Sequence, residues 1–154
     1  MNEKQLFNYL DKVLCEDKNF MKKGKLCYFR VINVNIIQII NIQFKKGEKK
    51  KLNINISSYP LILKEFSNVY FVIGGRLNKY IGVKDKWFDR TPEFLDLFTE
   101  AFDSKITGWF EEVDSVSKFL EEIIIFFGFN CLISSIVILS FLYTVGSEPS
   151  SPKY

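Results

Sequence analysis

Residues 35–57 read NIIQIINIQFKKGEKKKLNINIS, and this stretch decides the fold. Residues 35–44 are rich in isoleucine, a composition typical of β-strands. Residues 52–57 alternate apolar and polar side chains, which is the period of a strand with one face in water. The lysine-rich residues 45–51 are typical of an exposed loop. The stretch therefore predicts a hairpin of two antiparallel strands joined by a charged loop.

The alternation also predicts which side chains of the second strand face the core. A strand allows only one register with respect to a buried face, because its side-chain period is two residues. We expect Ile54 and Ile56 to be buried and Asn53 and Asn55 to face water.

Further strands are expected on both sides of this hairpin. Residues 26–32 and 68–74 are aromatic and β-branched, and the lysines and glycine of residues 22–25 indicate a turn. Short connections favour antiparallel neighbours. We therefore predict an α+β domain over residues 1–122, with an antiparallel sheet of about four strands and flanking helices.

Three helices are expected in this domain. Residues 3–14 carry apolar side chains at helical spacing, and Thr91, Pro92 and Glu93 form a capped helix start. The second helix would bury Phe94, Leu95, Phe98, Ala101 and Phe102. A third helix is predicted from Asp114 or Ser115 onward.

The C-terminal part contains a long apolar run. Residues 123–145 hold no charged side chain, and a helix needs about 20 apolar residues to cross a bilayer. We predict a tail anchor in the inner membrane, followed by a disordered tail at residues 146–154. The alternative is a buried terminal helix or strand, because the preceding helix could use Ile123 and Phe127 for the soluble core.

The composition excludes several classes of catalytic and metal site. The chain of 154 residues has no histidine, which removes Ser-His-Asp and Cys-His catalysis and all histidine-ligated metals. Its three cysteines, Cys15, Cys27 and Cys131, form no zinc or disulfide pattern and fit a reducing compartment. No apolar region follows the N-terminus as in a signal peptide. We expect a cytoplasmic protein with no cofactor and no metal.

Charge is unevenly distributed along the chain. Residues 1–51 hold 12 basic and 5 acidic side chains, whereas residues 52–122 hold 8 basic and 12 acidic ones. This predicts a basic side and an acidic side. The lysines of residues 45–51 are interpreted as a solvated loop or as a contact for anionic lipid headgroups. Nucleic acid is not expected, since the chain has 18 lysines but only 3 arginines and lacks an RNA-recognition signature.

Four residues are the candidate binding residues, Arg76, Asp85, Trp87 and Asp89. Arg76 follows a glycine pair that could cradle a phosphate, although a strand-terminal turn explains the glycines equally. Asp85 and Asp89 could bind a divalent metal, but neighbouring Lys86 and Arg90 would neutralise them. The chain has two pairs of adjacent aromatic residues, Trp87-Phe88 and Trp109-Phe110. These side chains are either core aromatics or interface anchors.

The chain resembles the bacterial domain of unknown function 4304 family over about residues 3–122. The resemblance rests on the order of four short motifs, Ile40-Asn41-Ile42-Gln43, Ile54-Asn55-Ile56, Asp85-Lys86-Trp87-Phe88-Asp89 and Trp109-Phe110. Phe88 replaces the usual second tryptophan, and the apolar tail is not a feature of the family. The resemblance implies an α+β domain in a bacterial cytoplasm and, for some relatives, an immunity-type role in toxin systems.

Two hypotheses about function follow. The first is a non-enzymatic binding module, of immunity type, whose acidic half or Trp87 surface occupies a protein partner. The alternative is a histidine-free, metal-dependent enzyme that uses Asp85 and Asp89. The exposure and pairing of these two carboxylates distinguish the hypotheses.

Overall fold

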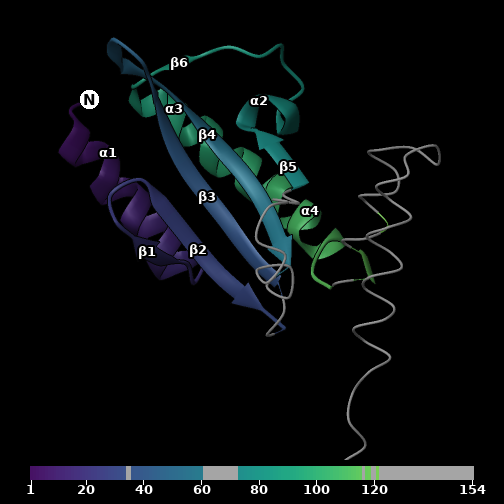
Figure 1. Cartoon of the computed structure of the whole chain (residues 1–154). Helices are drawn as coiled ribbons and strands as arrows, with labels where there is room; N and C mark the ends of the chain where they lie inside the picture. Colours follow the sequence, from purple (N-terminus) through teal and green to yellow (C-terminus); the bar gives the residue numbers. More distant parts are fainter. Residues whose placement is uncertain (34–35, 61–72, 116, 119–120, 122–154) are drawn as a thin grey trace, which may run out of the picture.

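A computed structural model describes residues 1–33, 36–60, 73–115, 117–118 and 121 (Figure 1). The chain begins with α1 (Glu3–Leu10), which continues as the π-helix η1 (Asp11–Asp17). The strands are β1 (Met21–Lys23), β2 (Cys27–Ile32), β3 (Ile36–Lys45), β4 (Glu48–Pro60), β5 (Ile73–Arg76) and β6 (Phe88–Asp89). The later helices are α2 (Leu77–Tyr80), α3 (Pro92–Ala101), η3 (Phe102–Ile106) and α4 (Thr107–Glu112).

Within the described residues, the six strands form one antiparallel sheet in the order β1-β2-β3-β4-β5, and β6 pairs with β4. The predicted hairpin is its centre, with Ile40 opposite Ile56 and Ile42 opposite Ile54. The predicted α+β class and the antiparallel sheet are confirmed, with more strands than the four expected.

Two segments that we predicted to be turns belong to strands. The backbone ladder continues through most of residues 45–51, because Gly47 adopts a φ of +81° and lets the chain reverse between Lys45 and Glu48. Lys22 and Lys23 likewise pair with β2, and the reversal falls at Gly24, whose φ is +66°. Lysine side chains can extend from a strand into water, so a run of lysines in the sequence does not distinguish a strand from a turn.

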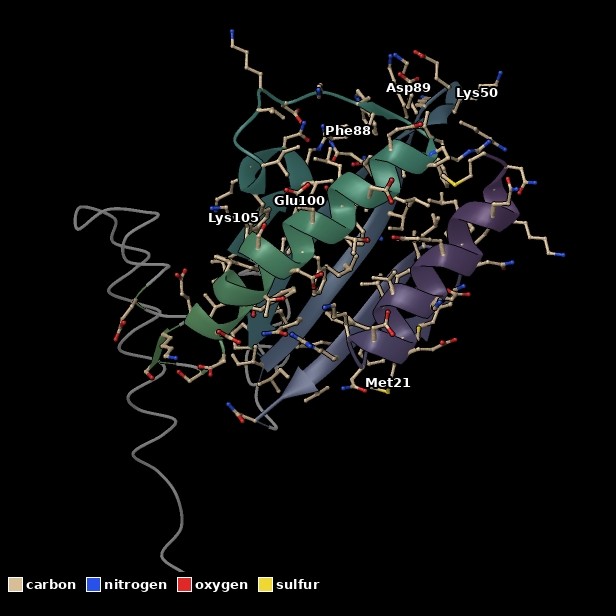
Figure 2. All side chains as sticks on the ribbon, turned by 180° about the vertical axis from the view of Figure 1, so that it is seen from behind. Met21, Lys50, Phe88, Asp89, Glu100 and Lys105 are labelled. Carbon is tan, nitrogen blue, oxygen red and sulfur yellow. The ribbon has the colours of Figure 1, made fainter. Side chains whose placement is uncertain are left out.

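All long helices lie on one face of the sheet (Figures 1 and 2). The helices α1, η1, α3, η3 and α4 bury their apolar sides against alternate residues of β2, β3 and β4. Ile54 and Ile56 are fully buried in this core, as predicted. Asn53 faces away from the helices, also as predicted, yet it is fully buried, which corrects the expectation that it contacts water.

A buried polar network ties the two helical segments to the sheet. Gln38 lies among the core positions of β3 and donates from Nε2 to the carbonyl oxygen of Phe110, at 3.0 Å. Its Oε1 accepts from Arg30 Nε at 2.7 Å, and Arg30 Nη1 donates to the carbonyl of Lys18 at 3.0 Å. Burial lowers the pKa of the Arg30 guanidinium, which stacks on Phe20 and keeps its hydrogen bonds. The network satisfies groups that would otherwise be costly to bury.

The predicted helices are confirmed where they are described. Residues 3–14 fall in α1 and η1, and Thr91 caps α3 by accepting from the backbone N–H of Phe94 at 3.4 Å. The predicted strand at residues 68–74 is described only from Ile73 onward. The predicted helix near Ser115, the apolar run 123–145 and the tail 146–154 lie largely or wholly outside the described residues. In the described part, no helix has the length and hydropathy needed to span a membrane.

A prediction on stability concerns the centre of the hairpin. Ile54→Ala should lower the free energy of unfolding by about 2–5 kcal/mol, because it removes fully buried methyl groups and leaves a cavity. Asn55→Ala on the opposite face is the matched control and should cost far less. Urea denaturation measures both, and equal losses would show that the assigned core face is wrong.

A second prediction concerns pH. Asp11 accepts hydrogen bonds from Tyr28 at 2.6 Å and from Lys22 at 2.6 and 2.7 Å. Burial, together with the hydrogen bond to Asp11, raises the pKa of Tyr28. The folded state therefore retains the phenol proton above pH 10, where unfolded tyrosine loses it, so this contribution to stability is present below about pH 10 and is lost above it. Tyr28→Phe should flatten the decline in unfolding free energy between pH 9 and 11.

Tyr9→Phe is the control for the pH prediction. It removes a hydroxyl that contacts Thr99 Oγ1 at 3.0 Å and leaves Tyr28 in place. This variant should keep the wild-type decline in alkali, and a decline of unchanged steepness in Tyr28→Phe would contradict the assignment.

Candidate functional site

Three of the four candidate residues meet at the end of β5. Arg76 Nη1 lies 3.0 and 2.9 Å from the two carboxylate oxygens of Asp85, and its Nη2 donates to Gln43 Oε1 at 3.2 Å. The guanidinium carbon lies 4.7 Å from the centroid of the Trp87 ring, within the range of a cation–π contact. We call Arg76, Asp85 and Trp87 the Arg76 group. It is partly exposed and is held in one geometry by contacts on several sides of the guanidinium.

The glycines before Arg76 allow β5 to lie against β4. Gly74 has a φ of +142°, and a Cβ atom there would be 2.1 Å from the carbonyl oxygen of Ile56. Only glycine permits this approach. The positive φ agrees with the structural interpretation of the glycine pair, although the pair lies within β5 rather than in a turn after it. The close pairing brings Arg76 opposite Asn55.

Two buried asparagines hold the segment that carries Asp85 and Trp87. Asn53 Nδ2 donates to Asn78 Oδ1 at 2.6 Å and to the carbonyl of Lys86 at 2.8 Å. Asn78 Nδ2 donates to the carbonyls of Lys84 and Lys86, both at 3.2 Å. Residues 84–86 have no regular ladder of their own, so the asparagines take the place of secondary structure in positioning them. Sequence reasoning missed both residues, because an asparagine in a strand does not reveal what covers it.

Asp89, the fourth candidate, does not join the Arg76 group. It lies on β6 opposite Lys51 of β4 and is exposed. We expected Lys86 and Arg90 to neutralise the carboxylates of Asp85 and Asp89, but neither side chain pairs with them. Lys86 lies over the Phe88 ring, and Arg90 Nε donates to the carbonyl of Met1 at 3.1 Å. In the described part of the chain, no group of three or more aspartate, glutamate or cysteine side chains is arranged to hold a metal ion.

The aromatic candidates divide between core and surface. Phe88 and Phe110 are buried in the main core, whereas Trp87 and Trp109 are half-buried. Trp109 packs edge-on against Tyr80, with ring centroids 5.4 Å apart. The core interpretation therefore holds for the two phenylalanines, and Trp87 keeps a surface that a ligand can reach.

The outer side of α3, η3 and α4 carries the acidic charge. Glu93, Asp96, Glu100 and Asp103 are exposed at spacings of three and four residues, which places them along one side of the helix. Glu111 and Glu112 are exposed on α4. We call these six residues the acidic helix face. Asp103 is paired with Lys18, and the other five form no salt bridge within the described residues.

A cavity of about 230 Å³ opens on the acidic helix face, between α2 and α3. Tyr80, Ile81, Leu97 and Ala101 give it apolar walls, and Glu100 and Lys105 lie at its rim (Figure 2). No motif in the sequence indicated this cavity, because its lining comes from the end of α2, from α3 and from η3, which meet only in the folded chain.

Comparisons with known proteins found no matching protein-family model, no similar curated protein and no similar solved structure. The resemblance to the domain of unknown function 4304 family stays a prediction.

The asparagine contacts yield a test of how the Arg76 group is positioned. Asn78→Ala should lower the free energy of unfolding by about 1–3 kcal/mol, because the buried Asn53 amide loses one of its two acceptors and the carbonyl of Lys84 loses its Asn78 donor. The substitution should also loosen residues 84–86, and their backbone amides should then exchange hydrogen with solvent faster. Asn55→Ala, which changes a more exposed amide on the same sheet face, is the control. Unchanged exchange in Asn78→Ala would mean that other contacts hold the segment.

Proposed function

We propose that this chain is a non-enzymatic binding module, of immunity type, that occupies a basic protein partner. The observation that carries the proposal is the acidic helix face, where five exposed carboxylates form no salt bridge within the described residues. Uncompensated charge of one sign attracts a partner of opposite sign and speeds its approach.

The cavity beside Glu100 supports the same proposal. Interfaces concentrate their binding energy in a few side chains that fill pockets, surrounded by charged residues that steer and align the partner. The apolar walls at Tyr80 and Leu97 fit an aliphatic or aromatic side chain.

The alternative, a metal-dependent enzyme using Asp85 and Asp89, draws no support from the geometry. Arg76 engages both oxygens of Asp85, and Asp89 lies on β6 opposite Lys51, outside the Arg76 group. A two-carboxylate site needs both groups directed at one centre.

We also propose a cytoplasmic setting. Cys15 and Cys27 are free thiols, and burial raises the pKa of each, which suits structural cysteines in a reducing compartment. Attachment to the inner membrane through residues 123–145 stays a prediction, because that segment lies outside the described residues.

The proposal predicts which charges matter for capture of the partner. With the full-length chain as bait, a basic protein should be captured at low salt and lost at 0.5 M salt, since screening weakens exposed charges. An Asp96→Lys/Glu100→Lys double variant should reduce its capture at least tenfold. Quantitative mass spectrometry of the captured proteins measures both effects.

The matched control is a Glu16→Lys/Asp17→Lys double variant. It makes the same charge change at two exposed positions of η1. Capture should stay within twofold of the wild type. Equal loss in both variants would indicate a non-specific effect of net charge and would count against the acidic helix face as the binding surface.

A further inference from the structure

The end of the β3–β4 hairpin collects positive charge from distant parts of the chain. Strand β6 pairs with β4 here, and the backbone N–H of Arg90 donates to the carbonyl of Lys50 at 2.8 Å. These contacts place residues 88–90 beside residues 50–52, and Figure 2 shows Lys50 and Asp89 close together. Residues 84–86 follow on the same side of β4, where the carbonyl of Lys86 accepts from Asn53. We call residues 45–51 together with residues 84–90 the basic end.

Most cations of the basic end are available to a ligand. Lys45 pairs with Glu48, and Arg90 is held by the carbonyl of Met1. Five other lysines are exposed and form no salt bridge within the described residues, namely Lys46, Lys49, Lys50, Lys84 and Lys86. The basic end therefore carries a clear excess of positive charge.

The sheet face that has no helices continues from the basic end. Pairing registers place Gln43, Asn41, Asn55 and Arg76 on this face, next to Lys51. The amide of Asn55 reaches Asn41 and Gln43 only at 3.4 Å, so these contacts are weak and the amides retain capacity for a ligand. Arg76 covers one side of the Trp87 ring, and its side chain is 29% exposed, which leaves surface against which a base can stack.

The geometry disfavours a membrane as the partner of the basic end. Asn33 donates to the carbonyl of Asp114 at 3.1 Å, so the chain leaves the described domain near the β2–β3 turn. That turn is separated from the basic end by the ten residues of β3, about 30 Å of strand. Among the described residues, no large exposed apolar side chain lies in residues 45–51 that could insert into a bilayer.

We propose that the basic end and the adjoining polar sheet face bind single-stranded nucleic acid. The lysines contact phosphates, and the Arg76 group and the amides contact unpaired bases. Lysine rather than arginine dominates, so we infer binding with little sequence preference. This surface shares no residue with the acidic helix face, and the inference is independent of the proposed function.

The test uses the full-length chain and a fluorescent 20-nucleotide oligo(U), followed by anisotropy. A Lys49→Gln/Lys50→Gln double variant should raise Kd at least fivefold. It should also lower the slope of log K against log salt by about 1.4, because each single-strand phosphate contact contributes about 0.7. The control, Lys12→Gln/Lys105→Gln, removes two exposed lysines from the helical layer and should change Kd by less than twofold.

Two further measurements distinguish single-stranded nucleic acid from the other anionic ligands, which are duplex nucleic acid and lipid headgroups. Trp87→Ala should weaken oligo(U) more than a 20-base-pair duplex, because only unpaired bases can stack on the Arg76 group. Equal weakening of both, or equal effects of the two lysine pairs, would overturn the proposal. The proposal would also be overturned if the chain failed to bind oligo(U) but bound phosphatidylserine vesicles, and if that vesicle binding depended on Lys49 and Lys50. The two proposals can fail separately. If no basic protein binds the acidic helix face, the oligo(U) results expected here are unchanged.

Discussion

The structure depends on one constraint, which is that a single layer of helices covers a single face of the β3–β4 hairpin. Alternate residues of the two strands, among them Ile40, Ile42, Ile54 and Ile56, pack against that layer. A one-residue slip of β4 would turn Ile54 and Ile56 into water and Asn53 and Asn55 into the core. The register of the hairpin therefore also decides which side chains remain on the uncovered face.

Polar side chains complete this arrangement where apolar packing cannot. Gln38 occupies a core position of β3 and joins Arg30 to the carbonyl of Phe110, so strand, helix end and neighbouring strand are held together. Asn53 and Asn78 play the same part on the other face, where they bind the backbone of residues 84–86. Leaving a buried amide without its partners costs about 1–3 kcal/mol, which makes both arrangements specific. The Arg76 group thus depends on the same pairing register as the hydrophobic core.

Local signals explain which features were predictable. The alternation at residues 52–57 and the cap at Thr91 are encoded within a few residues, and both appear in the structure. The burial of Asn53, the two-residue strand β6 and the pairing of Arg76 with Asp85 depend on segments that meet only in the folded chain. Sequence proximity favoured Lys86 and Arg90 as partners of the carboxylates. Asp85 lies in a segment without strand pairing, however, and the fold brings the end of β5 beside that segment, so its partner is Arg76.

The same pairing sharpens the separation of charge. Residues 92–114 contain seven acidic side chains and one basic side chain, and the helices hold them on the side away from the open sheet face. Residues 84–90 belong by sequence to the acidic half, yet β6 carries their lysines to the hairpin, where residues 45–51 already hold five lysines and one glutamate. Like charges gathered in this way repel one another and cost stability. Within the described residues no salt bridge joins the two groups, so each remains available to a partner of opposite charge.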